Sequence, residues 1–275
     1  MSSSVLITGC SSGIGYTCAH ALHKQGFTVI ASCRSQDDVD QLQSEGLTCI
    51  QLDISDNDSI TLGVTRAIEL AGGTLDAVFN NGAYGQPGAL EDLPTEALRD
   101  QFETNFFGWH ELTKQLIPHF RQNGKGRIIQ NSSVLGFAAM KYRGAYNASK
   151  FALEGWTDTL RLELHNTNIH VALIQPGPIE TRFRTNAKKA FQRWIHTESS
   201  PHSAQYQLQM ARLSKDESNN QFVLPAESCV QPLLHALTAK KPKLRYRITT
   251  PTIVFAVLKR LLPSRWLDPI LRKAA

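Results

Sequence analysis

Six short apolar runs, rich in β-branched residues, constrain the fold of this chain more than any other feature. They occupy residues 5–8, 28–31, 48–52, 77–79, 127–130 and 170–174. Because they lack polar alternation, the runs are typical of strands that are buried on both faces. The segments between them have helical periodicity and are long enough for crossover connections. The pattern, which a run at 244–248 extends, predicts an α/β fold with a doubly wound parallel sheet.

Length and periodicity favour one domain. A chain of 275 residues fits one large α/β domain or two small ones, and no linker or internal repeat divides this one. Between residues 182 and 224 the periodicity gives way to a polar stretch, where an active-site lid would follow the sixth strand. We therefore predict a single domain over residues 1–275 with a substrate-lid insertion at 182–224, a stretch that could also form a small subdomain.

Charge and cysteine content exclude several function classes. The net charge is +5 and the pI is near 9.0, but the basic residues form no stripe with interleaved aromatic residues. This suits an anionic cofactor and does not indicate a nucleic-acid partner. The five cysteines have neither CxxC spacing nor paired histidines, so we expect no metal site and no disulfide framework. The chain starts without a basic, apolar leader, which predicts a cytoplasmic location.

A glycine-rich turn, TGCSSGIG at residues 8–15, lies between the first apolar run and a helical segment. Glycines allow a tight turn and let the backbone approach a pyrophosphate, while amides at the helix N-terminus donate to the phosphates. A plain strand-to-helix turn is the alternative. We expect cofactor contacts from Gly9, Ser11, Ser12, Gly13, Ile14 and Gly15.

Tyr146 and Lys150 lie four residues apart on a predicted helix, and therefore share one face of it. A tyrosine is a useful acid or base near neutral pH only if its pKa falls from about 10 to about 7. A fixed cation nearby can supply part of that change. The alternative is a chance pairing on an amphipathic helix.

The turn has the spacing TGxxxGxG, and together with Tyr146 and Lys150 it resembles the short-chain dehydrogenase/reductase family over nearly the whole chain. The resemblance implies a Rossmann-type oxidoreductase that uses a nicotinamide cofactor. It also implies four catalytic residues, Asn105, Ser133, Tyr146 and Lys150. Ser133, rather than its neighbour Ser132, has the family spacing because it lies thirteen residues before Tyr146.

The resemblance also implies a role for each of these residues. Tyr146 would donate a proton to the substrate carbonyl oxygen, and Ser133 would donate a hydrogen bond to the same oxygen. Lys150 would lower the pKa of Tyr146 and hold the nicotinamide ribose, while Asn105 would hold a water beside the lysine. The alternatives are structural: serines end strands, and asparagines cap helices or bind backbone.

The end of the second strand predicts the cofactor. NAD-preferring Rossmann proteins usually carry an acidic residue there, whereas this chain has Arg34, whose guanidinium can pair with a 2′-phosphate. We therefore expect NADP (NADPH), the alternative being an exposed Arg34 with Asp37 or Asp38 on the ribose. Asp53 matches the family position at the adenine edge, and its alternative role is an N-terminal cap for the next helix.

Two further loops match family positions for the cofactor. The first contributes Asn81 and Gly82, and the second contributes Pro176, Gly177, Ile179 and Thr181. The first loop reads Asn-Asn-Gly-Ala where the family usually has Asn-Asn-Ala-Gly. If the fourth place required a positive φ, Ala83 would be strained there.

The sequence says least about the substrate and the partners. The run after Lys150 and the loop at 176–181 resemble the subgroup of retinol dehydrogenases, estradiol-type hydroxysteroid dehydrogenases and bacterial aldehyde reductases, which implies a lipophilic carbonyl or alcohol. The alternatives are a non-catalytic NADP-binding sensor or scaffold, and an epimerase or dehydratase. The latter would usually need a larger domain after Thr181.

The C-terminal segment at 252–275, which we expect to form one closing helix, is apolar, with Lys259 and Arg260 interrupting it and Trp266 following. It is too short and too charged to span a bilayer. Three interpretations stay open: packing against its own domain, a contact within a homo-oligomer (dimer or tetramer), and peripheral membrane contact.

Overall fold

The apolar runs form the seven strands of one parallel sheet, in the order β3-β2-β1-β4-β5-β6-β7. The strands are β1 (Ser4–Ile7), β2 (Thr28–Cys33), β3 (Thr48–Gln51), β4 (Ala77–Asn80), β5 (Gly126–Asn131), β6 (Ile169–Gln175) and β7 (Arg245–Arg247). The computed structural model describes residues 3–213 and 221–273. The predicted doubly wound sheet in a single domain is confirmed.

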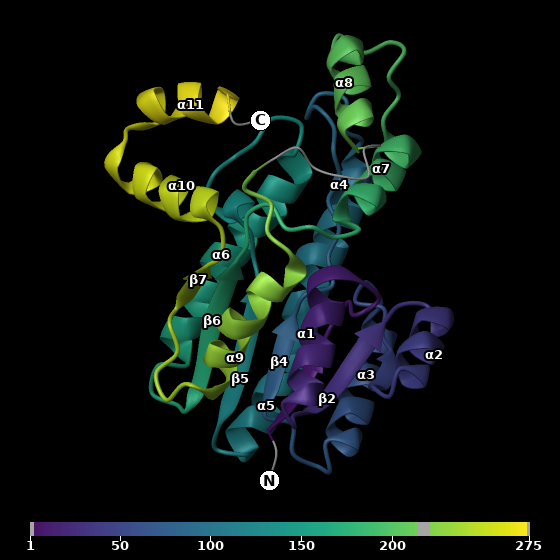
Figure 1. Ribbon diagram of the computed structural model, residues 1–275, viewed down its shortest axis with the longest axis vertical. Coiled ribbons are helices and arrows are strands. Elements are labelled where there is room, and N and C mark those ends of the chain that lie inside the picture. Colours follow the sequence, from purple (N-terminus) through teal and green to yellow (C-terminus); the bar gives the residue numbers. More distant parts are fainter. Residues whose placement is uncertain (1–2, 214–220, 274–275) are drawn as a thin grey trace.

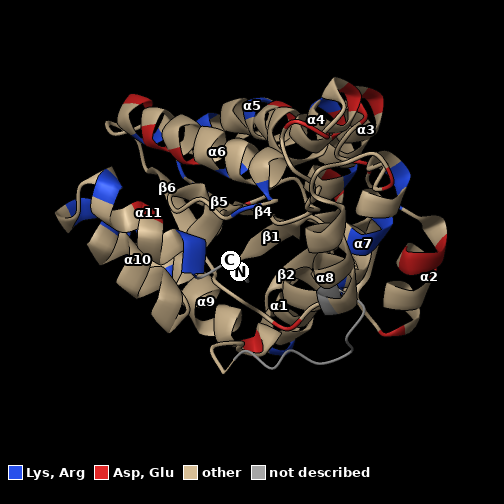
Figure 2. Cartoon of the chain, turned by 90° about the horizontal axis from the view of Figure 1, so that it is seen from above, with Lys and Arg blue, Asp and Glu red and all other residues tan. Residues whose placement is uncertain are grey.

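Helices cover both faces of the sheet (Figure 2). One face carries α1 (Gly13–Lys24), α2 (Gln36–Ser44) and α9 (Val230–Thr238). The other carries α3 (Asn57–Leu70), α4 (Thr95–Phe102), α5 (Gly108–Gln122) and α6 (Gly144–Glu163). Each face has its own apolar core, because side chains alternate along every strand and both sets must be buried.

The order of strands reverses between β1 and β4, which are neighbours although two strands separate them in the chain. In an open parallel sheet, such a switch point leaves a crevice at the carboxyl ends of the strands. The glycine-rich turn follows β1 and the Asn81-Gly82 loop follows β4. The fold therefore brings two of the predicted cofactor loops together.

Two helices of the predicted insertion, α7 (Phe183–Trp194) and α8 (Ser203–Leu213), follow β6 and rise above the carboxyl ends of the strands (Figure 1). A small core of Ala89, Phe191, Ile195 and Tyr206 joins them to the loop after β4. Residues 214–220 of the insertion lie outside the described residues. A lid function for 182–224 stays a prediction.

The C-terminal segment forms two helices, α10 (Thr250–Leu261) and α11 (Ser264–Lys273), rather than one. Leu262 is extended because the residue before a proline is disfavoured in helical conformation. Thr252 and Ala256 face the domain, whereas Leu261 and Trp266 are 73% and 64% exposed. Packing against the domain thus accounts for one face of the segment. Oligomer and membrane contacts by the other face stay predictions, and residues 274–275 lie outside the described part.

Across residues 3–213 and 221–273, every helix is either too short or too polar to cross a lipid bilayer.

Candidate active site

The glycine-rich turn presents an open helix N-terminus. Gly9 and Gly13 have φ values of +69° and +60°, which L residues rarely adopt. Ser12 is extended and its side chain makes no capping hydrogen bond to α1, whose first turn contains no acidic residue. The first amides of α1 are therefore suited to an anion, and they are what a pyrophosphate would require.

The loop after β4 holds this turn in place. The Nδ2 of Asn81 donates to the carbonyls of Thr8 and Gly9, at 2.9 and 3.1 Å. In return, the Oγ1 of Thr8 accepts from the amides of Asn81 and Gly82, at 2.8 and 2.9 Å. A Cβ on Gly15 would lie 2.3 Å from the carbonyl oxygen of Gly9, so that glycine lets α1 pack onto the turn.

The exchanged residues of this loop are not strained. Ala83 has no positive φ, since among the described residues Tyr142 is the one non-glycine residue with such an angle. Gly82 occupies the place next to the glycine turn, where a Cβ on it would lie 3.3 Å from the amide nitrogen of Gly9. Ala83 packs beside the core instead. The strain that the sequence left open does not arise.

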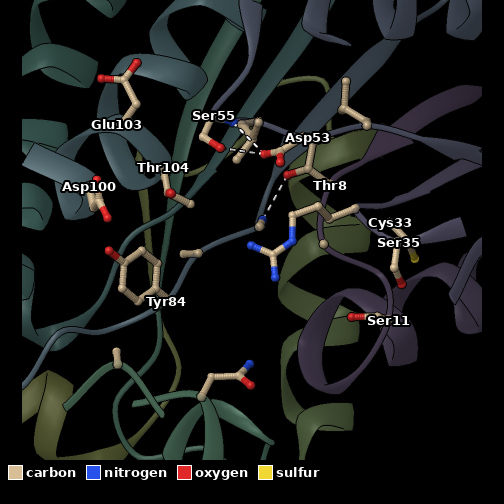
Figure 3. Close-up of a pocket in the computed structure, with 18 of the residues that line it drawn as sticks. Thr8, Ser11, Cys33, Ser35, Asp53, Ser55, Tyr84, Asp100, Glu103 and Thr104 are labelled. Atoms are coloured by element: carbon tan, nitrogen blue, oxygen red, sulfur yellow. Dashed lines mark hydrogen bonds between the residues drawn. The ribbon is translucent and has the colours of Figure 1, made fainter. Parts of the chain in front are cut away.

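A cleft of about 550 Å³ opens above the carboxyl ends of β1, β2 and β4. Figure 3 shows Ser11 and Ser35 on one side of it and Tyr84, Asp100 and Thr104 on the other. Of the predicted cofactor residues, five line it: Gly9, Ser11, Arg34, Asp53 and Gly82. The remaining cofactor residues lie at or behind the glycine turn or beside Tyr146, and do not line this cleft.

Arg34 is exposed at the end of β2, and Asp38 lines the same cleft, held by Ser35 at the start of α2. Asp53 accepts hydrogen bonds from the backbone and the hydroxyl of Ser55, at 2.9 and 2.7 Å. It does not cap the next helix: Asp56 does, accepting from the amide of Asp58. The alternative role of Asp53 as a helix cap is therefore wrong, because the helix begins four residues later, at Asn57.

The far wall of the cleft comes from α7, which the sequence did not indicate as a cofactor element. Lys189 and Arg193 contribute cations to this wall, while Asp100 and Glu103 contribute carboxylates to the same cleft. Arg193 also lies 3.8 Å from Asp100. In the sequence, the polar side chains of α7 were the one sign that this helix could take part in binding. Only the fold brings them over the cleft.

Tyr146 and Ser133 meet at the carboxyl end of β5. Burial raises the pKa of Tyr146 to about 12, although a hydrogen bond with Ser133 and the charge of Arg143 act to lower it. The Oγ of Ser133 also accepts from the amide of Leu135, at 3.0 Å. The serine and the tyrosine thus share one point at which a substrate oxygen could accept from both.

Lys150 is 1% exposed and reaches the same strand end. Its Nζ donates to the carbonyl of Asn131 at 2.7 Å and lies 4.2 Å from the centre of the Trp109 ring. Burial lowers the pKa of Lys150 to about 7, and the charge of Glu154 opposes that change. The expected lowering of the tyrosine pKa is not seen, because desolvation of the buried phenol is the largest effect on it.

Asn105 is buried in a π-helical turn, η1 (Glu103–Phe107), between α4 and α5. Its side chain accepts from the amide of Tyr84 at 3.1 Å and donates to the carbonyl of Tyr84 at 2.8 Å. π-helical turns are frequent at functional sites. The amide group of Asn105 therefore binds the loop after β4, and its predicted water beside Lys150 stays a prediction.

The loop after β6 lies against the glycine turn and the C-terminal helices. A Cβ on Gly13 would lie 2.8 Å from the Cγ2 of Thr181, and one on Gly177 would lie 2.0 Å from the Oγ1 of Thr249. The carbonyl of Pro176 accepts from the amide of Val134, and Ile179 pairs with Leu224 at the end of the insertion. The loop is thus fixed on both sides of the segment that would meet a nicotinamide.

Three residues of the site were missed at the sequence level: Thr8, Trp109 and Asn131. Thr8 precedes the first glycine of the turn and Asn131 precedes the serine pair, so their positions were visible. Trp109 gave no signal, because a buried tryptophan on a helix is typical of any core. Its indole nitrogen donates to the carbonyl of Gly82 at 2.9 Å, which links α5 to the cofactor loop.

Comparisons with known proteins agree with this geometry. Residues 3–192 match the family model for short chain dehydrogenases. The uncharacterized oxidoreductase YbbO of Escherichia coli (strain K12) is 42% identical over 272 residues, covering 99% of this chain and 95% of that protein. Retinol dehydrogenase 8 of Bos taurus is 29% identical, covering 94% and 86%. An actinorhodin polyketide ketoreductase variant with NADPH has a TM-score of 0.72 and 25% identity, covering 90% and 95%.

Proposed function

Because the chain belongs to the short-chain dehydrogenase/reductase family, we propose that it is an NADP-dependent oxidoreductase acting on a lipophilic carbonyl or alcohol. The observation that carries this proposal is the buried group of Ser133, Tyr146 and Lys150 at the end of β5. The glycine turn stands beside it across the switch point of the sheet. An aldehyde, a retinoid or a steroid-like ketone is the class of substrate that we expect.

The residues would divide the chemistry as follows. NADPH, when bound, supplies the hydride. Tyr146 donates its phenolic proton to the substrate oxygen, and the hydroxyl of Ser133 stabilises the charge that develops on that oxygen. Lys150 holds the ribose and, when charged, favours the phenolate that proton donation leaves on Tyr146. Asn105 holds the loop after β4 in place through its two hydrogen bonds with the backbone of Tyr84.

Several residues support the cofactor assignment. Gly9, Ser11, Gly13 and the first amides of α1, with Ser12, Ile14 and Gly15 in the same turn, would hold the pyrophosphate. Arg34 would pair with the 2′-phosphate, since its guanidinium lies exposed in the cleft with Lys189 on another wall. Asp53 and the Asn81-Gly82 loop would meet the adenosine. Pro176, Gly177, Ile179 and Thr181 would meet the carboxamide.

An aromatic side chain beside the tyrosine supports a lipophilic substrate. The ring of Phe183, at the start of α7, lies edge-on to Tyr146 with the centres 5.3 Å apart. The similarity to retinol dehydrogenase 8 agrees with this class of substrate. All five cysteines are free and buried, which supports a reducing compartment, namely the cytoplasm.

The experiment is to follow NADPH consumption against aldehydes, retinal and keto-steroids, for the wild type and for Tyr146→Phe. We expect Tyr146→Phe to lose about 100-fold or more of the turnover, because the proton donor is gone. NADPH affinity should change by no more than about twofold. Tyr16→Phe, on α1, is the matched control and should retain wild-type turnover. Tight NADPH binding without turnover of any of these carbonyls would favour a non-catalytic sensor or scaffold.

A further inference from the structure

One buried carboxylate holds the ends of two strands that carry the site. Glu154 follows Lys150 by one turn of α6 and is 8% exposed. Its Oε1 accepts from the Oγ of Ser132 at 2.6 Å and from the Nε2 of Gln175 at 2.8 Å. Ser132 directly follows β5 and Gln175 ends β6, so the carboxylate ties the ends of the two strands together at the edge where the chemistry is proposed.

The neighbours of these two residues are site residues. Ser132 lies between Asn131 and Ser133 in the sequence. The carbonyl of Asn131 accepts a hydrogen bond from Lys150, and Ser133 hydrogen-bonds with Tyr146. Gln175 directly precedes the Pro176-Gly177 loop. A displacement of Glu154 would therefore move Ser133, the Asn131 carbonyl that accepts from Lys150, and the Pro176-Gly177 loop together.

The carboxylate is surrounded by hydrogen-bond donors. Its Oε2 accepts from the Nε of Arg245 on β7 at 3.1 Å, so three donors converge on it. Arg245 also donates to Asp158 at 2.7 Å, and Asp158 pairs with Arg161. Glu154 and Asp158 thus share the guanidinium of Arg245.

The carboxylate of Glu154 also acts on Lys150. Lys150 meets the neutral groups of Trp109 on α5 and Asn131 on β5, together with the phenol of Tyr146 on its own helix. Glu154 is the charged group that raises the pKa of Lys150 against burial. The lysine can stabilise a phenolate and hold a ribose best when charged, so its protonation matters to both proposed roles.

We propose that Glu154 is a positioning residue of this site, whose carboxylate aligns the ends of β5 and β6 and keeps Lys150 charged. The inference rests on the proposed function, because it assigns Glu154 a part in the binding of NADPH and in the reaction.

The test compares the dissociation constant of NADPH for the wild type and Glu154→Gln, by fluorescence titration between about pH 5.5 and pH 8.5. The 2′-phosphate of NADPH titrates identically in the two experiments. The ratio of the dissociation constant of the variant to that of the wild type therefore reports only on titration of the protein. We expect a ratio near 1 at the acid end and about 3- to 10-fold at the alkaline end, since the variant lysine loses its proton about half to one pH unit earlier. A ratio that does not change with pH would overturn the proposal.

Asp158→Asn is the matched control. It removes a carboxylate from the same helix and the same Arg245, yet it leaves the contacts of Glu154 with Ser132 and Gln175 intact. The ratio of its NADPH dissociation constant to that of the wild type should stay near 1 at every pH. A pH-dependent ratio as large as that of Glu154→Gln would contradict the assignment to Glu154.

Glu154→Asp distinguishes the effect of the negative charge from the effect of side-chain length. It is also the variant to use if circular dichroism shows that Glu154→Gln does not fold. The shorter side chain keeps the charge but cannot hold both Ser132 and Gln175, so turnover should fall about tenfold or more with a ratio independent of pH. Wild-type turnover in this variant would overturn the proposal. A wild type that does not bind NADPH would overturn the proposed function, and this inference with it.

Discussion

The Nζ of Lys150 lies over the face of the Trp109 indole, 4.2 Å from the ring centre. A buried ammonium has lost its water, and the indole face returns part of that stabilisation through its quadrupole. The same indole fixes the loop after β4 through Gly82. Trp109 therefore links the proposed ribose-binding lysine to the proposed adenosine loop, from a helix on which sequence patterns predict only core packing.

Replacing this indole should cost stability. Trp109→Phe keeps an aromatic face but leaves the carbonyl of Gly82 without its donor, and we expect a loss of about 2–3 kcal/mol in the free energy of unfolding. Urea denaturation measures it. Trp156→Phe, a half-buried tryptophan on α6, should lose less than about 1 kcal/mol. Equal losses in the two variants would contradict a special role for Trp109.

The buried lysine should make stability depend on pH. Its pKa falls from 10.5 to about 7 on folding, so between these values the unfolded chain holds a proton that the folded chain has lost. Since the unfolded state binds more protons, the stability of the wild type should rise with pH relative to Lys150→Met, by roughly 2 kcal/mol from pH 7 to pH 9. Urea denaturation of both proteins at each pH tests this. A constant difference would contradict it.

Arg34 should determine the choice of cofactor. Arg34→Asp replaces the guanidinium with a carboxylate that repels a 2′-phosphate and suits a ribose diol, so NADPH affinity should fall by about tenfold or more while NADH affinity rises. Titration of both nucleotides measures this. Arg66→Asp, an exposed arginine on α3 that pairs with Glu69, changes the net charge equally and should leave the preference unaltered. Equal affinity of the wild type for both nucleotides would refute the argument.

Asn105 should protect the backbone of Tyr84. In Asn105→Ala the amide of Tyr84 loses its acceptor, and its hydrogen exchange should become about tenfold faster or more. The carbonyl of Tyr84 keeps one donor, Gln101, so the loop should stay folded. Hydrogen exchange measured by NMR tests this, and an unchanged rate at Tyr84 would show that other contacts hold the loop.

The strands and the glycine turn could be predicted because their signals are local. A run of apolar residues without alternation has one stable environment, between two layers of helices, and a positive φ at Gly9 or Gly13 needs glycine. Pairs at fixed spacing, such as Tyr146 and Lys150, could be placed on one face of a helix in the same way. The break before α11 was missed although Pro263 was visible.

Two of the groups around Lys150 were decided only by the tertiary structure. Trp109 and Asn131 come from α5 and β5, and their distances to Lys150 depend on how two helices pack on one sheet. The pKa of the lysine depends on the same packing, because desolvation is a property of the whole environment and of no single residue. The sequence alone thus determined which strands form and which residues could react. The packing decided how those residues are charged and what holds them.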